Sequence, residues 1–283
     1  MNNLLLLVMN GLTYGALLFI VSSGFTLIFG LMRIVNMSHG VFYILGAYVS
    51  YTVQSKTGNW FLSTLVGTAA VGLTALIVYQ LINRVNGDLP RTLLTVGIAM
   101  ILADFCLWSW GGLPLTLQPP MQLRRPFILG NFIYPGFRSF VLVTAVVIGL
   151  ALWVLLHHTK FGAIVRAGVD NRWMVSALGI NIERIFALTF LLGGLLAGFG
   201  GAIGGSYLAF GPGTDFTILT YALVVVILGG MGSLAGSAIG AVVVGLVDSF
   251  GRTYFSELAI FLLSGTLILV LAFRPQGLFG KPS

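Results

Sequence analysis

A short polar cluster near the start of the chain contains the side chains best suited to chemistry or ligand binding. It runs over seven residues from Arg33 to His39, includes Asn36 and Ser38, and is followed directly by Gly40. Histidine and asparagine can both donate and accept hydrogen bonds, so this group could bind a polar ligand. The flanking residues are apolar, and burying polar groups among them is costly unless they have partners or a function.

The sequence lacks the motifs of several enzyme classes. It has no GxxxxGK[ST] phosphate-binding loop, no HExxH zinc motif and no GxSxG nucleophile motif. His157 and His158 lie beside Lys160, where a structural place at a helix end is favoured over metal binding. The single cysteine, Cys106, permits neither an internal disulfide nor a multi-cysteine metal site. We therefore predict no enzymatic activity, no metal, no cofactor and no ATP bound by this chain itself.

The composition indicates that the elements holding these residues lie in lipid. Of the 283 residues, 58% are hydrophobic and 7% are charged, and the mean hydropathy is +1.03. A soluble domain carries about 25% charged residues. The apolar runs are continuous rather than alternating, which indicates membrane-spanning helices instead of a barrel. The first residues, MNNLLLLVMN, lack the basic region and cleavage site of a signal peptide, so we expect a retained span.

Nine apolar segments can be placed along the chain. The second, seventh and eighth are too short for a perpendicular crossing, so half-helices are expected there. The connection at 113–138 contains five prolines and is predicted to be a structured surface loop. The sequence thus predicts an all-α polytopic transmembrane helical bundle of about eight spans with broken or re-entrant helices, in one domain over residues 1–283. The segments are 3–29, 41–53, 60–82, 92–112, 139–156, 185–210, 217–228, 237–250 and 258–273.

The net charge of +7 lies mostly in the connections between these segments. Basic residues retained on the cytoplasmic side explain it better than nucleic-acid binding does. The connection with Arg84 and Arg91 and the connection at 158–184 are therefore predicted to be cytoplasmic. Within the spans the main charges are Asp104 and Asp248, and we expect Asp104 in the bundle interior, paired with the nearby Trp108 or with backbone.

Glycine-rich sequence marks a second candidate site. Residues 229–236, GGMGSLAG, hold four glycines that weaken any helix, and they echo the pattern of the first polar cluster. Irregular backbone at this depth can line a watery pathway; a simple interhelical turn is the alternative, as an ordinary loop is for the first cluster. In 185–205, glycines spaced by four predict close helix packing. The predicted pathway residues are Asn36, Ser38, His39, Gly40, Gly229, Gly230, Gly232, Ser233 and Gly236.

The connection at 161–184 has the composition of a helix that docks on another protein. Good helix formers run from Gly162 to Gly179 without proline, and Arg166 and Asp170 are spaced for an ion pair on one face. Gly179 suits the end of this helix, and Asn181 suits the start of the next. The apolar side consists largely of alanine and glycine, which is too small for lying on a membrane and favours a groove on a partner.

Four stretches of this sequence resemble the permease subunits of the branched-chain amino acid ABC importer family. They are GFTLIFGLMRIVNMSHGVFYILGAY, RAGVDNRWMVSALGINIERIFALTFLLGGLLAGFGG, GGMGSLAGSAIGA and FRPQGLFG, which occur in the family's order. The resemblance extends over essentially the whole chain. The chain is most similar to the first of the two paired permeases, the type without an extended N-terminal region.

The resemblance implies a multi-pass protein of the bacterial inner membrane that moves branched-chain or related amino acids by alternating access. Its partners would be a second homologous permease, two ATPases that bind the ATP, and a periplasmic substrate-binding protein. Permeases for urea, short amides or aromatic acids are the alternative within the family, and a self-sufficient channel or secondary carrier is the alternative outside it. The implied coupling helix carries Gly162, Arg166, Ala167, Asp170, Ala177, Gly179 and Ile180.

Overall fold

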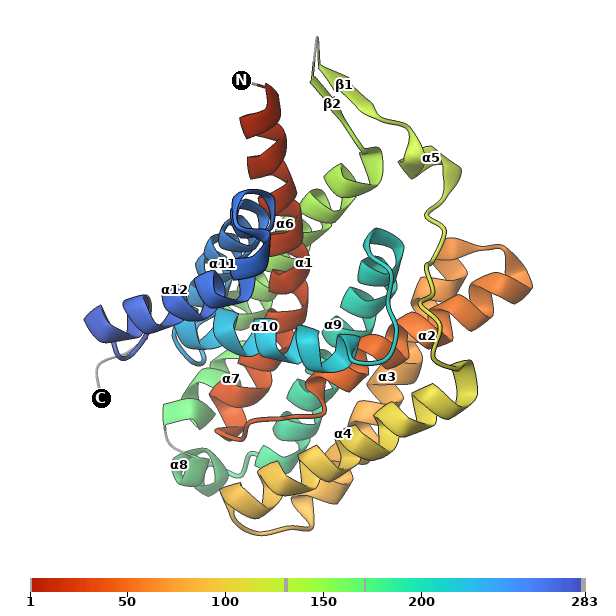
Figure 1. Cartoon of the computed structure of the whole chain (residues 1–283). Helices are drawn as coiled ribbons and strands as arrows, with labels where there is room; N and C mark the ends of the chain where they lie inside the picture. Colours follow the sequence, from red (N-terminus) through yellow and green to blue (C-terminus); the bar gives the residue numbers. More distant parts are fainter. Residues whose placement is uncertain (1, 130–131, 171, 281–283) are drawn as a thin grey trace.

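The computed structural model describes residues 2–129, 132–170 and 172–280, which are almost entirely helical (Figure 1). The predicted all-α class is therefore confirmed. Besides α-helices, the regular elements in the described part are a short 3₁₀ turn, Ser256–Leu258, and a small hairpin of β1 (Phe127–Leu129) and β2 (Phe132–Tyr134). The helices are α1 (Asn2–Met32), α2 (His39–Thr57), α3 (Trp60–Asn83), α4 (Asp88–Trp110), α5 (Met121–Arg124), α6 (Gly136–His158), α7 (Lys160–Asp170), α8 (Arg172–Ala177), α9 (Ile182–Tyr207), α10 (Thr214–Gly229), α11 (Leu234–Tyr254) and α12 (Ala259–Phe273).

Within the described residues, six helices are long and apolar enough to cross a membrane: α1, α3, α4, α6, α9 and α11. The apolar helices α10 and α12 are shorter, with 16 and 15 residues, so the expected short seventh segment is present. The expectation of a half-helix at 237–250 is wrong, because α11 begins earlier, at Leu234, continues through Arg252 to Tyr254, and so reaches 21 residues. The second segment is also longer than expected, since α2 has 19 residues.

Helix α1 lies at the centre of the bundle and packs against α6, α9, α10 and α11, while α2 packs against α3 and α9. Close approach depends on glycine at these crossings. A Cβ on Gly15 would lie 2.6 Å from the carbonyl oxygen of Ala241, and one on Gly46 would lie 2.5 Å from that of Gly198. The predicted packing role of the glycines in 185–205 is confirmed for α9, where small residues let backbones meet without hydrophobic drive from lipid.

The proline-rich connection is ordered as a surface loop, as expected. Its first part is attached to the connection between α9 and α10 by paired backbone hydrogen bonds between Leu115 and Phe210, of 2.8 and 2.9 Å. Its second part contains α5 and the antiparallel hairpin, in which Phe127 faces Tyr134. The Tyr134 hydroxyl donates to the carbonyl of Met9 at 2.9 Å, which connects the hairpin to the start of α1.

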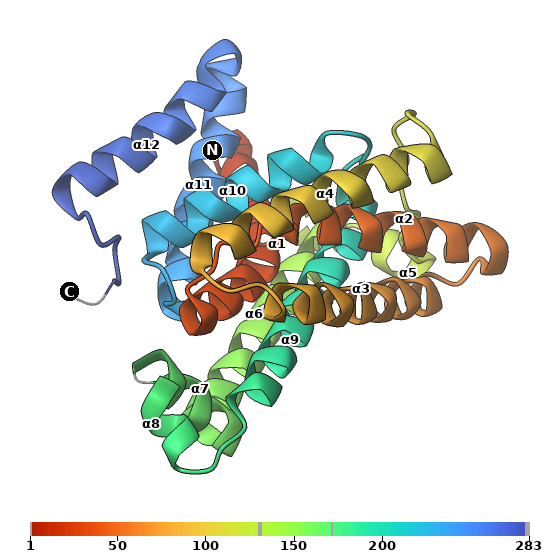
Figure 2. The same ribbon diagram turned by 90° about the horizontal axis from the view of Figure 1, so that it is seen from below.

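The two ends of the bundle carry different features (Figure 1). The N-terminus and the hairpin lie at the top of this view, whereas α7, α8 and the connection between α3 and α4 lie at the bottom. The two basic connections expected on one side of the membrane are thus at the same end of the molecule. Figure 2 shows α12 at the edge of the bundle, where it packs on α11 and α10.

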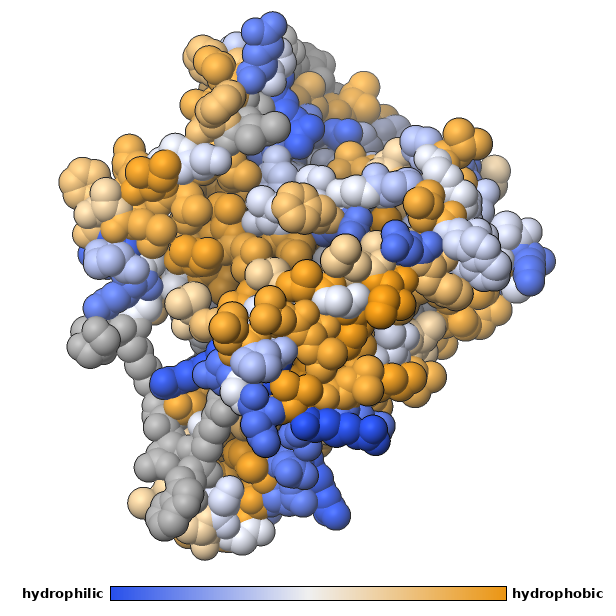
Figure 3. Space-filling model, turned by 60° about the horizontal axis from the view of Figure 1, so that its bottom comes forward, coloured by the Kyte–Doolittle hydropathy of each residue, from blue (hydrophilic) through white to orange (hydrophobic). Residues whose placement is uncertain are grey.

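Much of the outer surface is apolar, as a lipid-facing protein requires. Figure 3 shows a broad hydrophobic area, with hydrophilic side chains gathered at its lower border. Large aliphatic side chains are exposed on both α3 and α4, including Leu73, Ile77, Met100 and Ile101. Exposed apolar patches of this extent are rare on soluble monomers. The described part of the chain is therefore a multi-pass membrane protein.

Candidate functional site

The polar cluster forms the connection between α1 and α2. Helix α1 ends at Met32, and the next residue, Arg33, adopts a left-handed conformation with φ 54° and an exposed side chain. Left-handed backbone is costly for a residue with a Cβ, so the chain is held there by its surroundings. The bond from Arg33 N to Phe29 O, of 2.8 Å, closes the last turn of α1.

Asn36 and Ser38 are buried and connect this break to α4. The Asn36 side-chain oxygen accepts from the Ser38 backbone N–H at 3.1 Å. The Ser38 hydroxyl donates to the carbonyl of Thr95 at 2.8 Å, and the Met37 backbone N–H donates to the Thr95 hydroxyl at 3.0 Å. These bonds hold the irregular backbone in place inside the protein. Its N–H and C=O groups need such partners there, because lipid offers no hydrogen bonds.

His39, the first residue of α2, is fully buried and does not face lipid. Its Nε2 lies 2.9 Å from the carbonyl oxygen of Val21, so this nitrogen donates and Nδ1 is left as an acceptor. The ring packs edge-on against Phe25 and Phe42. Within the described residues, neither His39 Nδ1 nor Asn36 Nδ2 has a hydrogen-bond partner. Because buried polar atoms normally have hydrogen-bond partners, this acceptor and this donor are available to bind a polar group at the break.

Gly40 brings the start of α2 against α10. A Cβ at Gly40 would lie 2.2 Å from the carbonyl oxygen of Asp215 and 2.8 Å from Leu219 Cβ. Residues 36–40 therefore contact α1, α4 and α10 together, which an ordinary surface loop would not do. The break is an internal junction of the bundle, although contact with a substrate stays a prediction.

The glycine-rich segment is a tight turn between α10 and α11. Gly230 and Gly232 have φ of 102° and 85°, which only glycine adopts readily. The Ser233 hydroxyl accepts from the Gly236 N–H at 3.0 Å and so starts α11. The C-terminal tail covers the turn, because Phe279 N donates to the carbonyl of Gly229 at 3.0 Å. The local geometry is that of the interhelical turn given as the alternative.

The structure brings these two predicted segments together at the end of α1. A Cβ on Gly30 would lie 3.1 Å from the Cα of Gly232. One turn earlier, the hydroxyls of Thr26 and Ser237 are 2.5 Å apart. The two segments therefore meet through the last two turns of α1, and a movement of α1 would reach both of them.

The predicted coupling segment is helical on both sides of residue 171. Helix α7 ends at Asp170 and α8 begins at Arg172; residue 171 and the side chain of Asp170 lie outside the described residues, so the ion pair of Asp170 with Arg166 stays a prediction. The predicted helix ends are confirmed: Gly179 has φ 77°, and the Asn181 side chain accepts from Arg184 N at 3.1 Å.

Helix α7 has one face against the bundle and one face exposed. Gly168 is buried, and a Cβ there would lie 3.1 Å from Leu31 Cδ1 at the end of α1. At the start of the helix, a Cβ on Gly162 would lie 2.2 Å from the carbonyl oxygen of Leu156, so the turn out of α6 is tight. The remaining described members of the predicted set are placed as follows: Arg166, Ala167, Ala177 and Gly179 are exposed, and Ile180 is half-buried.

The expectation for Asp104 is wrong. Its side chain is exposed on α4, next to Trp108, which is 83% exposed. The residue was expected inside because a charge in a span is costly. Helix α4 instead has its main helix contacts with α2 and α3 and leaves the Asp104 side chain exposed.

Asp248 belongs to a polar group that sequence reasoning did not assemble. The carboxylate is buried and accepts from the Tyr221 hydroxyl at 2.5 Å and from Arg252 Nε at 2.8 Å. The spacing of Asp248 and Arg252 by four residues was a visible signal. Tyr221 comes from α10, and its contribution depends on how α10 packs against α11.

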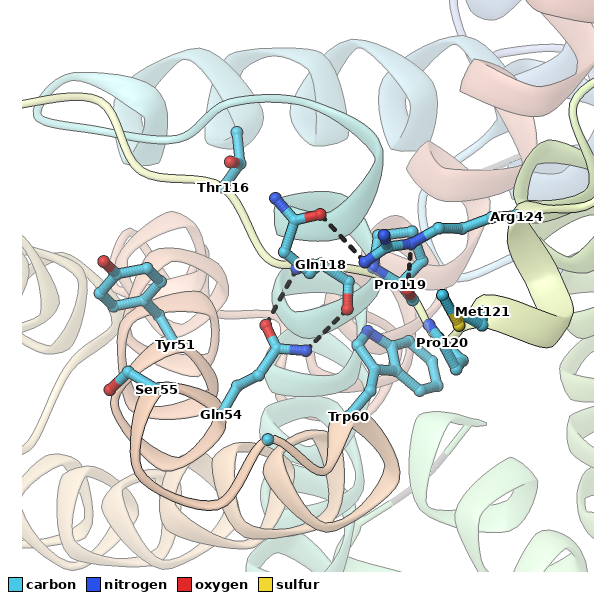
Figure 4. Close-up of a pocket in the computed structure, with 11 residues that line it drawn as sticks. Tyr51, Gln54, Ser55, Trp60, Thr116, Gln118, Pro119, Pro120, Met121 and Arg124 are labelled. Atoms are coloured by element: carbon cyan, nitrogen blue, oxygen red, sulfur yellow. Dashed lines mark hydrogen bonds between the residues drawn. The ribbon is translucent and has the colours of Figure 1, made fainter.

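A surface pocket of about 440 Å³ lies between the end of α2 and the proline-rich loop (Figure 4). Gln54 bonds with the backbone of Gln118 through both side-chain atoms, at 2.7 and 2.9 Å, and Arg124 donates to the Gln118 side chain at 3.0 Å. None of the predicted site residues lines this pocket. Among the described residues, no group of three or more His, Cys, Asp and Glu side chains could hold a metal ion.

The six long apolar helices and the internal breaks between helices define a multi-pass helical membrane protein. Residues 7–271 match the sequence model of the family described as "Branched-chain amino acid transport system / permease component". The chain therefore belongs to this permease family, and the resemblance drawn from its motifs is confirmed.

Individual relatives agree with the family match. The chain is 28% identical to the branched-chain amino acid permease BraD of Pseudomonas aeruginosa and 27% identical to LivH of Escherichia coli K12, covering 96% of this chain and 94% of each relative. It is 25% identical to LivM of E. coli K12, over 92% of this chain and 67% of LivM. The better coverage of LivH agrees with the expected type without an extended N-terminal region.

A solved structure shows the same fold. The structure described as PsaBC from Streptococcus pneumoniae in complex with Fab matches with a TM-score of 0.53 at 12% identity, covering 94% of this chain and 91% of the other. At this identity the likeness supports the helical arrangement alone.

Proposed function

We propose that this chain is the membrane-spanning permease subunit of an ATP-driven importer for branched-chain or related amino acids in the bacterial inner membrane. The observation that carries the proposal is the family match over residues 7–271, with relatives named as branched-chain amino acid permeases. The substrate passes through the protein by alternating access, and no reaction takes place on this chain.

The complete transporter contains a second homologous permease, two ATPases and a periplasmic substrate-binding protein. The ATPases dock against α7 and α8, because these short helices expose Arg166, Ala167 and Ala177 at the end of the bundle. A helix presenting small side chains beside a charge suits a groove on a partner. The binding protein approaches the opposite end, where the hairpin and the N-terminus lie.

A physical route connects the docking helices to the two breaks. Gly168 of α7 packs on Leu31, and the adjacent Gly30 packs on Gly232. ATP-driven closure of the ATPases pushes α7, and the packed contacts pass this displacement to the end of α1 and from there to both breaks. Rigid packed elements with two arrangements are the kind of network that transmits such a change.

Co-purification of the ATPases tests the docking surface. Arg166→Glu and Asp170→Lys reverse charges on α7, and we expect each to lower the amount of ATPase that co-purifies while the membrane protein is still made. Arg84→Glu reverses an exposed charge at the same end of the bundle, in the connection between α3 and α4, and serves as the matched control. Undiminished ATPase with both α7 variants contradicts the assignment.

A further inference from the structure

A compact group of charged and phenolic side chains lies between α10 and α11, away from both breaks. The Asp248 carboxylate uses one oxygen for the Tyr221 hydroxyl at 2.5 Å and the other for Arg252 Nε at 2.8 Å. Arg252 Nη2 also donates to the Tyr221 oxygen at 3.3 Å. Tyr14 of α1 packs edge-on against the Tyr221 ring, with 5.6 Å between centroids. The three polar groups thus form a closed triangle beside α1.

The two charged members differ in their surroundings. The Asp248 side chain is 9% exposed, while that of Arg252 is 62% exposed. Among the described residues, Arg252 Nη1 has no hydrogen-bond partner, so this amino group can bind a further acceptor. The ion pair therefore extends from the interior of the bundle, at Asp248, to the exposed end of α11, at Arg252. An ion pair buried on both sides would not be accessible in this way.

A second basic side chain faces the same region from other helices. Arg138, at the start of α6, lies over the ring of Tyr207 at 5.5 Å and bonds to the side-chain oxygen of Asn10. Tyr207 is the last residue of α9, and α9 and α11 both end toward the top of Figure 1. The Tyr134 hydroxyl completes the group by pairing with Thr13 at 2.7 Å. Residues from α1, α6, α9, α10 and α11 therefore surround this end of the bundle.

We propose that Tyr221, Asp248 and Arg252 form a binding subsite for the zwitterionic head of an amino acid. The proposal rests on the proposed function and names the part of the substrate that this chain recognises. The ammonium group binds Asp248 and the Tyr221 hydroxyl oxygen, and the carboxylate binds Arg252. Arg guanidinium groups match carboxylates in geometry, and carboxylates accept from ammonium groups.

The charge pattern selects for this class of ligand. The buried anion is Asp248 and the partly exposed cation is Arg252. A ligand that carries both a positive and a negative charge can bind to both of them, and these two contacts then take the place of the ion pair. A neutral amide supplies no full charge, and an organic acid supplies only the negative one, so neither makes a charged contact with Asp248. The subsite therefore favours amino acids over the amides and aromatic acids that remained open from the sequence.

The test uses the whole transporter, with its second permease, ATPases and binding protein, reconstituted in liposomes with leucine as the probe. The readout is leucine taken up per ATP hydrolysed, because a subsite defect uncouples the two while assembly is retained. We expect Asp248→Asn and Tyr221→Phe to lower this ratio, by about tenfold for Asp248→Asn, as loss of a charged contact predicts. Glu257→Gln, which removes an exposed acid just after α11, is the control and leaves the ratio unchanged.

The double variant Asp248→Arg with Arg252→Asp separates recognition from structure. It keeps an ion pair between the same positions but reverses its direction, so we expect it to remain defective. Recovery of the wild-type ratio, or an unchanged ratio in Asp248→Asn, overturns the proposal. Where a charge variant fails to assemble, Tyr221→Phe carries the test because it keeps both charges and the ring, and an unchanged ratio there overturns it. Absence of leucine uptake by the unaltered transporter contradicts the proposed function instead.

Discussion

Gly30 in the last turn of α1 and Gly232 in the turn between α10 and α11 are in backbone contact. A Cβ on Gly30 would lie 3.1 Å from the Cα of Gly232. The next residue, Leu31, packs on Gly168 of α7. The end of α1 therefore lies between the helices proposed to meet the ATPases and the glycine-rich turn, and its position depends on both.

A large side chain at position 30 is expected to separate these elements. Gly30→Leu forces the turn at Gly232 away, and we expect it to lower the free energy of unfolding by about 1–3 kcal/mol, as overpacking does. Uptake by the reconstituted transporter should fall with it. Thermal unfolding of the detergent-solubilised protein and leucine uptake are the two measurements.

Gly97→Leu is the matched control for that variant. Gly97 lies within a spanning helix, α4, and a Cβ there would have no heavy atom within 4 Å. We expect normal unfolding and normal uptake. If Gly30→Leu and Gly97→Leu have the same unfolding temperature and the same leucine uptake, the contact between Gly30 and Gly232 contributes neither to stability nor to transport.

Thr95 fixes the polar break between α1 and α2. Thr95→Val keeps the shape of the side chain but removes the oxygen that accepts from Met37 N–H at 3.0 Å. A buried N–H without an acceptor costs about 1–3 kcal/mol, so the variant should unfold at a lower temperature. Thr92→Val, one turn earlier on α4, removes only a bond to the helix carbonyl of Asp88. A Thr95 variant as stable as the Thr92 variant would contradict this role.

The sequence was sufficient for the membrane class, the family and the approximate positions of most helices. Continuous apolar runs specify spans regardless of tertiary contacts, and the caps at Gly179 and Asn181 are local signals. The half-helix expected at 237–250 was wrong because an apolar segment ends where polar residues begin, whereas α11 continues beyond Phe250 through Arg252 to Tyr254.

The relationships between helices could not be read from the chain. The contact of Gly30 with Gly232 and the bond of Tyr221 to Asp248 join residues that are distant in sequence. They depend on how α1, α10 and α11 pack, which periodicity does not specify. Asp104 was misplaced for the same reason, since its helix gave no indication of which face lies outward.

Asp104 is expected to face water or the second permease, because a carboxylate against acyl chains costs about 3 kcal/mol at a helix centre. Asp104→Leu should therefore lower uptake or the yield of paired permeases, measured by co-purification. Ile101→Leu, on the same exposed face, should change neither. A leucine at 104 that leaves pairing and uptake intact and raises stability would show that Asp104 faces lipid.

Gly277 in the C-terminal tail is expected to tolerate no side chain. It has φ 79°, and a Cβ would lie 2.6 Å from the backbone nitrogen of Gly230. Left-handed backbone costs alanine about 1–2 kcal/mol before this clash, so Gly277→Ala should lower the unfolding temperature. Gly265→Ala in α12, where a Cβ meets nothing within 4 Å, should leave it unchanged or slightly raised. The reverse order of the two variants would contradict attachment of the tail to the α10–α11 turn.

ATP-dependent uptake of leucine into proteoliposomes tests the central claim most directly. The liposomes contain this permease, the second permease and the ATPases. The binding protein is added on the side of the membrane opposite the ATPases. We predict accumulation that requires ATP and disappears when the ATPases carry an inactivating substitution in their phosphate-binding loop. Leucine uptake that continues without functional ATPases, or no uptake when all partners are present and assembled, would contradict the assignment as an ATP-driven amino acid permease.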